Sequence, residues 1–78
     1  MRLYFVQFRC HPGMTYQVAD AIYDREVVSE LYSTSGDYDL MAKVYVPDSE
    51  DVGRFLAEKL FDIPGISRTL TTVTFRAY

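Results

Sequence analysis

The sequence predicts an α+β fold in which strands and helices follow in the order β-α-β-β-α-β. Four segments show period-two alternation or β-branched residues, as strands do. Two further segments carry apolar residues at helical spacing, and turns that contain glycine or proline separate most of the elements. With 78 residues and no linker or low-complexity segment, the chain is predicted to be a single domain, residues 1–78.

The first strand is predicted over Leu3–Cys10. Both of its faces are partly apolar, so we expect both to be covered. His11–Gly13 ends the strand because it contains proline and glycine. The first helix is then predicted to begin with Thr15 as its cap and to run to about Asp24. Its inward residues follow helical spacing: Val18, Ala19 and Ile22.

The middle of the chain predicts a hairpin. One strand is expected over Val27–Thr34 and the next over Tyr38–Val46, with Pro47 ending the second. Gly36 lies in the turn, where a positive φ is easily adopted. The second strand of the hairpin carries an unbroken apolar face: Tyr38, Leu40, Ala42, Val44 and Val46.

A second helix and a last strand complete the order. Ser49 is the predicted N-cap, and the acidic residues after it suit the positive end of the helix dipole. The apolar stripe is Val52, Phe55, Leu56 and Leu60, and Pro64-Gly65 ends the helix. Ile66 to Phe75 or beyond is rich in β-branched residues and is predicted as the fourth strand.

This order is typical of a ferredoxin-like fold, with two helices on one face of a four-stranded antiparallel sheet. The other face would be bare in a monomer. We expect it to hold Leu3, Phe5, Tyr32, Met41, Tyr45, Val73 or their neighbours. Because 49% of the residues are hydrophobic and the chain has seven tyrosines and five phenylalanines, one small core cannot cover them all. The sequence therefore predicts at least a dimer formed through the sheets.

Composition narrows the classes of function. The net charge is −3 and no basic run occurs, which argues against direct nucleic-acid binding. The single cysteine, Cys10, excludes an internal disulfide and fits a reducing cytoplasm. No apolar stretch approaches the roughly 18 residues of a membrane span, and no signal peptide is recognisable. The predicted location is therefore the cytoplasm, without a membrane partner.

Polar groups gather around the predicted turn. Hydroxyls, carboxylates and a phenol surround Gly36 and can hold a small zwitterion, but the pattern alone favours a simple hairpin turn, because any two strands need a turn and turns are built from these residues. These residues are Ser33, Thr34, Ser35, Asp37, Tyr38 and Asp39. No catalytic or metal site is predicted, since Cys10 and His11 point apart on a strand and no further ligands accompany them.

Three parts of the chain together resemble the effector-binding domain of the Lrp/AsnC transcription regulators, also called the RAM domain. They are the order of elements, the turn Ser35-Gly36-Asp37-Tyr38-Asp39, and the segment Ile63-Pro64-Gly65-Ile66-Ser67-Arg68-Thr69-Leu70-Thr71. The resemblance covers essentially the whole chain. Regulators of this family carry an N-terminal helix-turn-helix domain that this sequence lacks, so we expect a stand-alone RAM protein.

The resemblance implies dimers that assemble into rings, often octamers or decamers, with an amino acid bound between dimers. A full-length Lrp/AsnC regulator is a further partner that it implies, and no cofactor is expected. The ligand-binding residues carried over to this sequence are Ser33, Ser35, Gly36, Asp37, Tyr38, Asp39, Thr69 and Thr71. Backbone N–H groups near Gly36 would hold a carboxylate, and Asp37 or Asp39 an ammonium group.

Two other functions remain open at this point. The first is an enzyme of the dimeric α+β barrel type, such as a monooxygenase or isomerase, for which His11, Tyr38 and the acidic residues are the available groups. The second is an oligomerisation module without a ligand. The favoured interpretation is a non-enzymatic regulatory module, because no arrangement of the available groups indicates catalysis.

Overall fold

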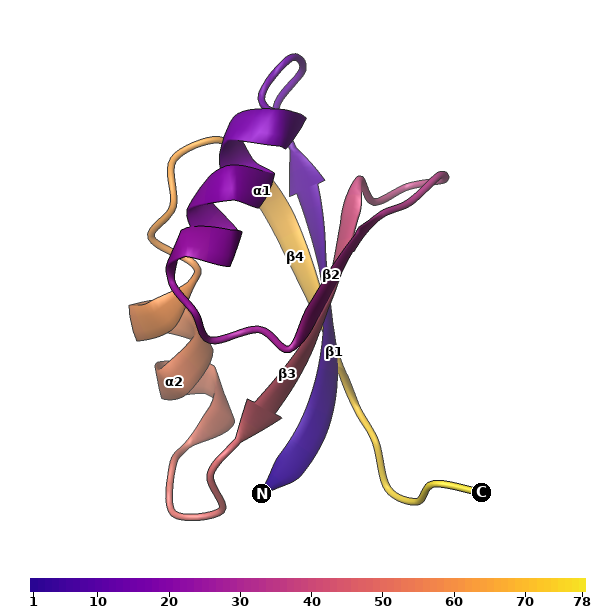
Figure 1. Ribbon diagram of the computed structural model, residues 1–78, viewed down its shortest axis with the longest axis vertical. Helices are drawn as coiled ribbons and strands as arrows, with labels where there is room; N and C mark the ends of the chain where they lie inside the picture. Colours follow the sequence, from indigo (N-terminus) through magenta and orange to yellow (C-terminus); the bar gives the residue numbers. More distant parts are fainter.

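A computed structural model describes all 78 residues and confirms the predicted β-α-β-β-α-β order (Figure 1). The four strands form one antiparallel sheet in the spatial order β2-β3-β1-β4. Both helices lie on the same face of this sheet (Figure 1). The elements are β1 (Arg2–Cys10), α1 (Thr15–Asp24), β2 (Glu30–Ser33), β3 (Leu40–Val46), α2 (Val52–Lys59) and β4 (Ile66–Val73).

Strand β1 lies in the interior of the sheet and pairs with β3 on one side and β4 on the other. Both faces of β1 carry apolar side chains, which explains why this strand lies in the interior of the sheet. Tyr4, Val6, Phe8 and Cys10 are buried on the helix side, with Phe8 fully buried. The intervening residues face the open side and stay half-buried or exposed.

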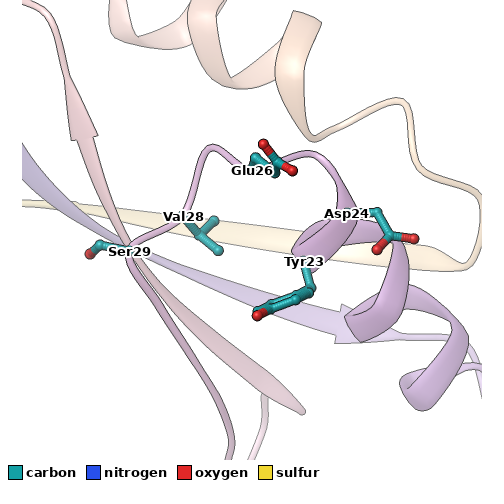
Figure 2. Close-up of a pocket in the computed structure, with 5 residues that line it drawn as sticks. All are labelled: Tyr23, Asp24, Glu26, Val28 and Ser29. Carbon is teal, nitrogen blue, oxygen red and sulfur yellow. The ribbon is translucent and has the colours of Figure 1, made fainter.

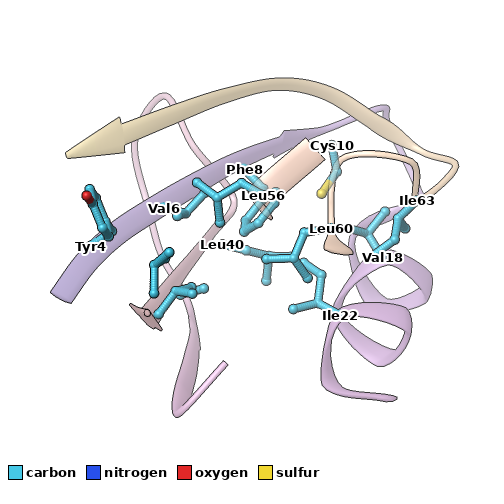
Figure 3. Packing of buried hydrophobic residues seen from close by; sticks show 13 residues of the cluster. Tyr4, Val6, Phe8, Cys10, Val18, Ile22, Leu40, Leu56, Leu60 and Ile63 are labelled. Carbon is cyan, nitrogen blue, oxygen red and sulfur yellow. The ribbon is translucent and has the colours of Figure 1, made fainter. Parts of the chain in front are cut away.

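The core lies between the sheet and the helices (Figure 3). All 13 buried residues are hydrophobic, and none is polar or charged. The predicted apolar face of β3 is buried at Leu40, Ala42, Val44 and Val46. Helix α1 contributes Val18 and Ile22 to the core, and α2 and the turn after it contribute Leu56, Leu60 and Ile63. Neither helix has the length and the apolar character that a membrane-spanning helix requires.

Both predicted helix caps were wrong by one or two residues. Thr15 is the first helical residue, and Met14 takes the cap position without a side-chain hydrogen bond. Helix α2 is capped by Asp51, whose carboxylate accepts a hydrogen bond of 2.9 Å from the Arg54 N–H. Ser49 is used instead in the turn that follows β3, where the Glu50 N–H donates to the Pro47 carbonyl at 3.0 Å.

Three strands are shorter than predicted. Strand β2 begins at Glu30 instead of Val27, because Val27 and Val28 leave the ladder and pack against the core. Strand β3 begins at Leu40 instead of Tyr38, and β4 ends at Val73 instead of Phe75. The chain after β4 leaves the sheet on the side away from the helices (Figure 1).

The open face of the sheet is partly apolar, as predicted, with one correction. The register places Leu3 beside Tyr45 and Tyr32 beside Met41 on this face. Val73, however, pairs with the buried Tyr4 and therefore lies on the helix side. Leu70 takes its place on the open face, where it pairs with Gln7 and is 46% exposed.

Candidate functional site

The β2–β3 hairpin contains six of the eight predicted site residues. Gly36 at its tip has a φ of 98°, in the left-handed region that glycine adopts at little cost. A Cβ added to Gly36 would meet no atom within 4 Å, so the backbone there is open to solvent. Thr34 closes the turn: its hydroxyl donates to the Tyr38 carbonyl at 2.9 Å and its N–H to the Asp39 carbonyl at 2.9 Å.

Asp39 attaches the hairpin to the end of β1. Its N–H donates to the Phe8 carbonyl at 2.9 Å, and its carboxylate accepts a hydrogen bond from the Cys10 N–H at 2.8 Å. One carboxylate oxygen of Asp39 is therefore already occupied by a hydrogen bond that fixes the hairpin to β1. The carboxylate of the exposed Asp37 makes no hydrogen bond or ion pair within the chain.

Two arginines contact the tip of the hairpin, Arg9 from β1 and Arg68 from β4. A guanidinium nitrogen of Arg9 donates to the Asp37 carbonyl at 2.9 Å, and the guanidinium of Arg68 lies 5.4 Å from the centre of the Tyr38 ring. The sequence analysis did not place either arginine among the ligand-binding residues, although Arg68 lies in the motif segment Ile63-Pro64-Gly65-Ile66-Ser67-Arg68-Thr69-Leu70-Thr71. The available signal was that alternation places Arg9 on the same face as Leu3 and Phe5, where a charged side chain is unexpected.

Thr69 and Thr71 lie apart from the hairpin within one chain. They pair with Phe8 and Val6 of β1, so both face the helix side of the sheet. Strand β4 is the edge opposite to β2, with β1 and β3 between them. A single copy therefore does not bring the two threonines and Gly36 into one pocket.

Cys10, whose N–H donates to Asp39 of the hairpin, is a buried free thiol. Burial raises the pKa of this thiol, and the charge of Asp39 raises the pKa further, while a hydrogen bond with Thr15 opposes both. The thiol is therefore held in its protonated form beside the hairpin.

Glu30, Tyr32 and Lys43 form a charged group on the open face of the two hairpin strands, β2 and β3. The Tyr32 hydroxyl donates to the Glu30 carboxylate, and the Lys43 ammonium lies 3.2 Å from its other oxygen. The hydrogen bond from Tyr32, followed by that from Lys43, lowers the pKa of Glu30. The bond with Glu30 in turn raises the pKa of both Tyr32 and Lys43.

The chain has three surface cavities, and none is lined by Gly36, Thr69 or Thr71. One of about 530 Å³ lies where α1 leads into β2 (Figure 2). It is lined by Tyr23, Asp24, Glu26, Val28 and Ser29. The five groups with displaced pKa values, which are Cys10, Glu30, Tyr32, Lys43 and Asp62, line none of these cavities. No group of three or more His, Cys, Asp or Glu side chains is placed to hold a metal ion.

Comparison with known families matches residues 3–78 to the Lrp/AsnC ligand binding domain. The chain belongs to this family. The Lrp/AsnC chain is 38% identical over 74 residues to an uncharacterized HTH-type transcriptional regulator of Pyrococcus abyssi, a match that covers 91% of this chain and 49% of that protein. It is 30% identical over 76 residues to the HTH-type transcriptional regulator FL11 of the same organism, covering 97% of this chain and 50% of FL11. The chain thus spans about half the length of these curated relatives.

Solved structures agree with the fold. The protein TTHA0845 from Thermus thermophilus superposes with a TM-score of 0.88 at 33% identity, covering 100% of this chain and 98% of that one. Escherichia coli AsnC superposes with a TM-score of 0.87 at 20% identity, over 96% of this chain and 51% of AsnC. The ferredoxin-like fold and the family suggested by the motifs are both confirmed.

Proposed function

We propose that this Lrp/AsnC chain is a non-enzymatic module that binds an amino acid and acts as an oligomer in the control of transcription or amino-acid metabolism. The observation that carries the proposal is the hairpin tip, where an open glycine backbone lies among polar groups that β1 and β4 hold in place. The family description, a ligand binding domain, and the relatives named as HTH-type transcriptional regulators support it.

The proposed contacts follow from the chemistry of a zwitterion. The bare backbone at Gly36 admits an anionic or polar group close to its N–H, because no Cβ blocks the approach. The free carboxylate of Asp37 pairs with the ammonium group, since one oxygen of Asp39 is already bonded to the Cys10 N–H. Further hydrogen bonds come from the hydroxyls and from the second Asp39 oxygen. The full set proposed is Ser33, Ser35, Gly36, Asp37, Tyr38, Asp39, Thr69 and Thr71.

Thr69 and Thr71 take part through assembly. Because they lie away from the hairpin of their own chain, we propose that a neighbouring copy contributes them or the surface around them. The open face supports such an assembly: Leu70 and Tyr45 are 46% and 42% exposed there. Two copies that pack these faces together would form the dimer, and dimers would form the proposed octameric or decameric ring. A full-length Lrp/AsnC regulator can join the same assembly.

The proposed mechanism is linkage between binding and assembly. A ligand that contacts one copy from each of two neighbouring dimers binds the ring more tightly than it binds separate dimers. It therefore shifts the population toward the ring. A change in assembly then alters which surfaces of the module are available for contact with its regulatory partner.

A thermal-shift screen against the common amino acids tests the proposal, with the oligomer mass measured in parallel. A ligand at about 100 times its dissociation constant adds about 2.7 kcal/mol of stability. We expect a clear shift with one or a few amino acids, and Gly36→Val should abolish it. Gly13→Val is the matched control, because Gly13 also has a positive φ and open space but lies outside the hairpin. A folded oligomer that no amino acid stabilises would contradict the proposal.

The open face is tested separately. Leu70→Glu places a charge on the proposed dimer face and should lower the mass seen by analytical ultracentrifugation. Glu58→Lys is an exposed control on α2, away from the sheet, and should leave the mass unchanged. An unchanged mass in Leu70→Glu would exclude this face from the assembly.

A further inference from the structure

Two arginines lie opposite each other on the open face, beside the hairpin tip. The register pairs Arg9 of β1 with Arg68 of β4, and both side chains are exposed. Residues paired in this way point to the same face, with Cβ atoms about 4.5–5.5 Å apart, and like charges in such a pair destabilise a sheet. The pair therefore costs stability unless something neutralises it.

The hairpin orients both side chains without neutralising them. Arg9 donates to the carbonyl oxygen of Asp37 at 2.9 Å, and Arg68 lies over the ring of Tyr38 at 5.4 Å. Neither guanidinium makes an ion pair: the ion pairs of the chain join the Met1 amino group to Asp48, Arg25 to Asp62, and Lys43 to Glu30. Each guanidinium has five N–H donors, so most donors of the pair are free to meet a ligand.

The backbone around the pair is irregular. The ladder between β1 and β4 shifts register directly after Arg9, because Cys10 pairs with Ile66. Such bulges turn side chains away from their regular direction and are common next to functional sites. Here the bulge lies at the point where Cys10 donates its N–H to Asp39 of the hairpin.

We infer that Arg9 and Arg68, at the hairpin end of the open face and outside the proposed dimer contact around Leu70 and Tyr45, form an anion subsite that binds the carboxylate of the effector next to the hairpin tip. This inference rests on the proposed function and adds two residues of β1 and β4 to its site. Guanidinium groups bind carboxylates through paired N–H donors, which a backbone N–H alone does not supply.

The charge balance favours a carboxylate over a phosphate group. Two arginines and the two carboxylates of Asp37 and Asp39 together carry no net charge. A zwitterion matches this arrangement, with its carboxylate at the arginines and its ammonium group at Asp37. A doubly charged phosphate would be repelled more strongly by the carboxylates of Asp37 and Asp39 than a singly charged carboxylate, and it has no ammonium group to pair with Asp37.

The test uses Arg9→Gln and Arg68→Gln, with Arg54→Gln as the matched control. Arg54 is an exposed arginine of α2 whose side chain makes no hydrogen bond or ion pair in the chain. Calorimetry measures binding of three probe sets to each protein: the common amino acids, their carboxamides, and the corresponding 2-oxo acids. Circular dichroism and oligomer mass confirm that each variant folds and assembles.

We expect the amino acids to bind and their carboxamides to fail. Loss of either arginine should weaken binding at least about tenfold, which corresponds to one lost charge-assisted contact. The Arg54→Gln protein should bind like the original chain. Arg68→Lys should recover binding only in part, because an ammonium group lacks the paired donors of a guanidinium.

Each other outcome has a definite meaning. Equal binding of amino acids and carboxamides, unaffected by either arginine variant, would overturn the subsite and leave the proposed function intact. Arginine-dependent binding of 2-oxo acids alone would support the subsite and contradict an amino-acid effector. No binding of any probe would overturn both. A lower oligomer mass with unchanged binding would assign the arginines to a contact between copies instead.

Discussion

Comparing Gly65→Ala with Gly36→Ala should separate two costs. One is the strain of a positive φ in a residue other than glycine, and the other is the steric conflict between an added Cβ and its neighbours. Both glycines have a positive φ, 100° and 98°, which an alanine adopts at a cost of about 1–3 kcal/mol. Around Gly36 an added Cβ meets nothing within 4 Å. At Gly65 it would lie 2.8 Å from a methyl carbon of Val18 and 2.9 Å from the terminal carbon of Met14.

The difference between the two variants follows from that contact. Val18 is fully buried in the core, so it has little room to move, whereas Met14 is long and flexible. Overpacking of this kind costs about 1–3 kcal/mol in addition to the strain. We therefore expect Gly36→Ala to lower the free energy of unfolding by about 1–3 kcal/mol and Gly65→Ala by about 2–6 kcal/mol.

Urea denaturation at one fixed protein concentration measures both values, because assembly makes stability depend on concentration. Each kcal/mol lost from the free energy of unfolding should lower the melting temperature by about 4–8 °C in a domain of this size. Gly13→Ala, with a φ of 80° and open space, should behave like Gly36→Ala. Equal destabilisation by Gly65→Ala and Gly36→Ala would refute the role assigned to the contact with Val18.

Three further predictions concern the core, the thiol and an ion pair. Leu56→Ala should cost about 2–5 kcal/mol in urea denaturation because Leu56 is 1% exposed, and a loss below about 1 kcal/mol would contradict its place in the core. Cys10 should react slowly with a disulfide reagent near pH 8, since burial and then Asp39 raise its pKa; Asp39→Asn should accelerate the reaction, and an unchanged rate would remove Asp39 as a cause. The hydrogen bond from Arg25 lowers the pKa of Asp62 below its ordinary 3.8, so the stability it adds is complete above pH 3.8 and is lost as the pH falls through the lower folded value. Asp62→Asn should flatten that part of the acid unfolding curve, and an identical curve would contradict the contribution of the pair.

The order and type of all elements were predictable from the sequence, because they depend on periodicity that is local to each segment. The alternation in Leu40–Val46 specified the buried face of β3. The prediction that Pro64-Gly65 ends the second helix was wrong, because α2 ends at Lys59 and a turn follows it; Gly65 has a positive φ just before β4. The glycine tip of the hairpin was equally visible, since Gly36 adopts the positive φ that a short turn favours.

The ends of elements were less predictable because competing hydrogen bonds decide them. Ser49 and Asp51 are both good caps, and only the turn that ties Glu50 to Pro47 leaves Asp51 as the one that caps α2. Likewise, Val27 and Val28 have high strand propensity, yet burial against the core draws them out of the ladder.

The sequence by itself determined the fold class, the family motifs and the polar hairpin, since all of these are contained in residues close together along the chain. Only the tertiary structure decided which distant residues meet that hairpin. The register brought Arg9 and Arg68 to its tip and turned Thr69, Thr71 and Val73 toward the helices. Because one residue of register shift reverses the face of every side chain in a strand, these neighbours depend on strand pairing that no local pattern specifies.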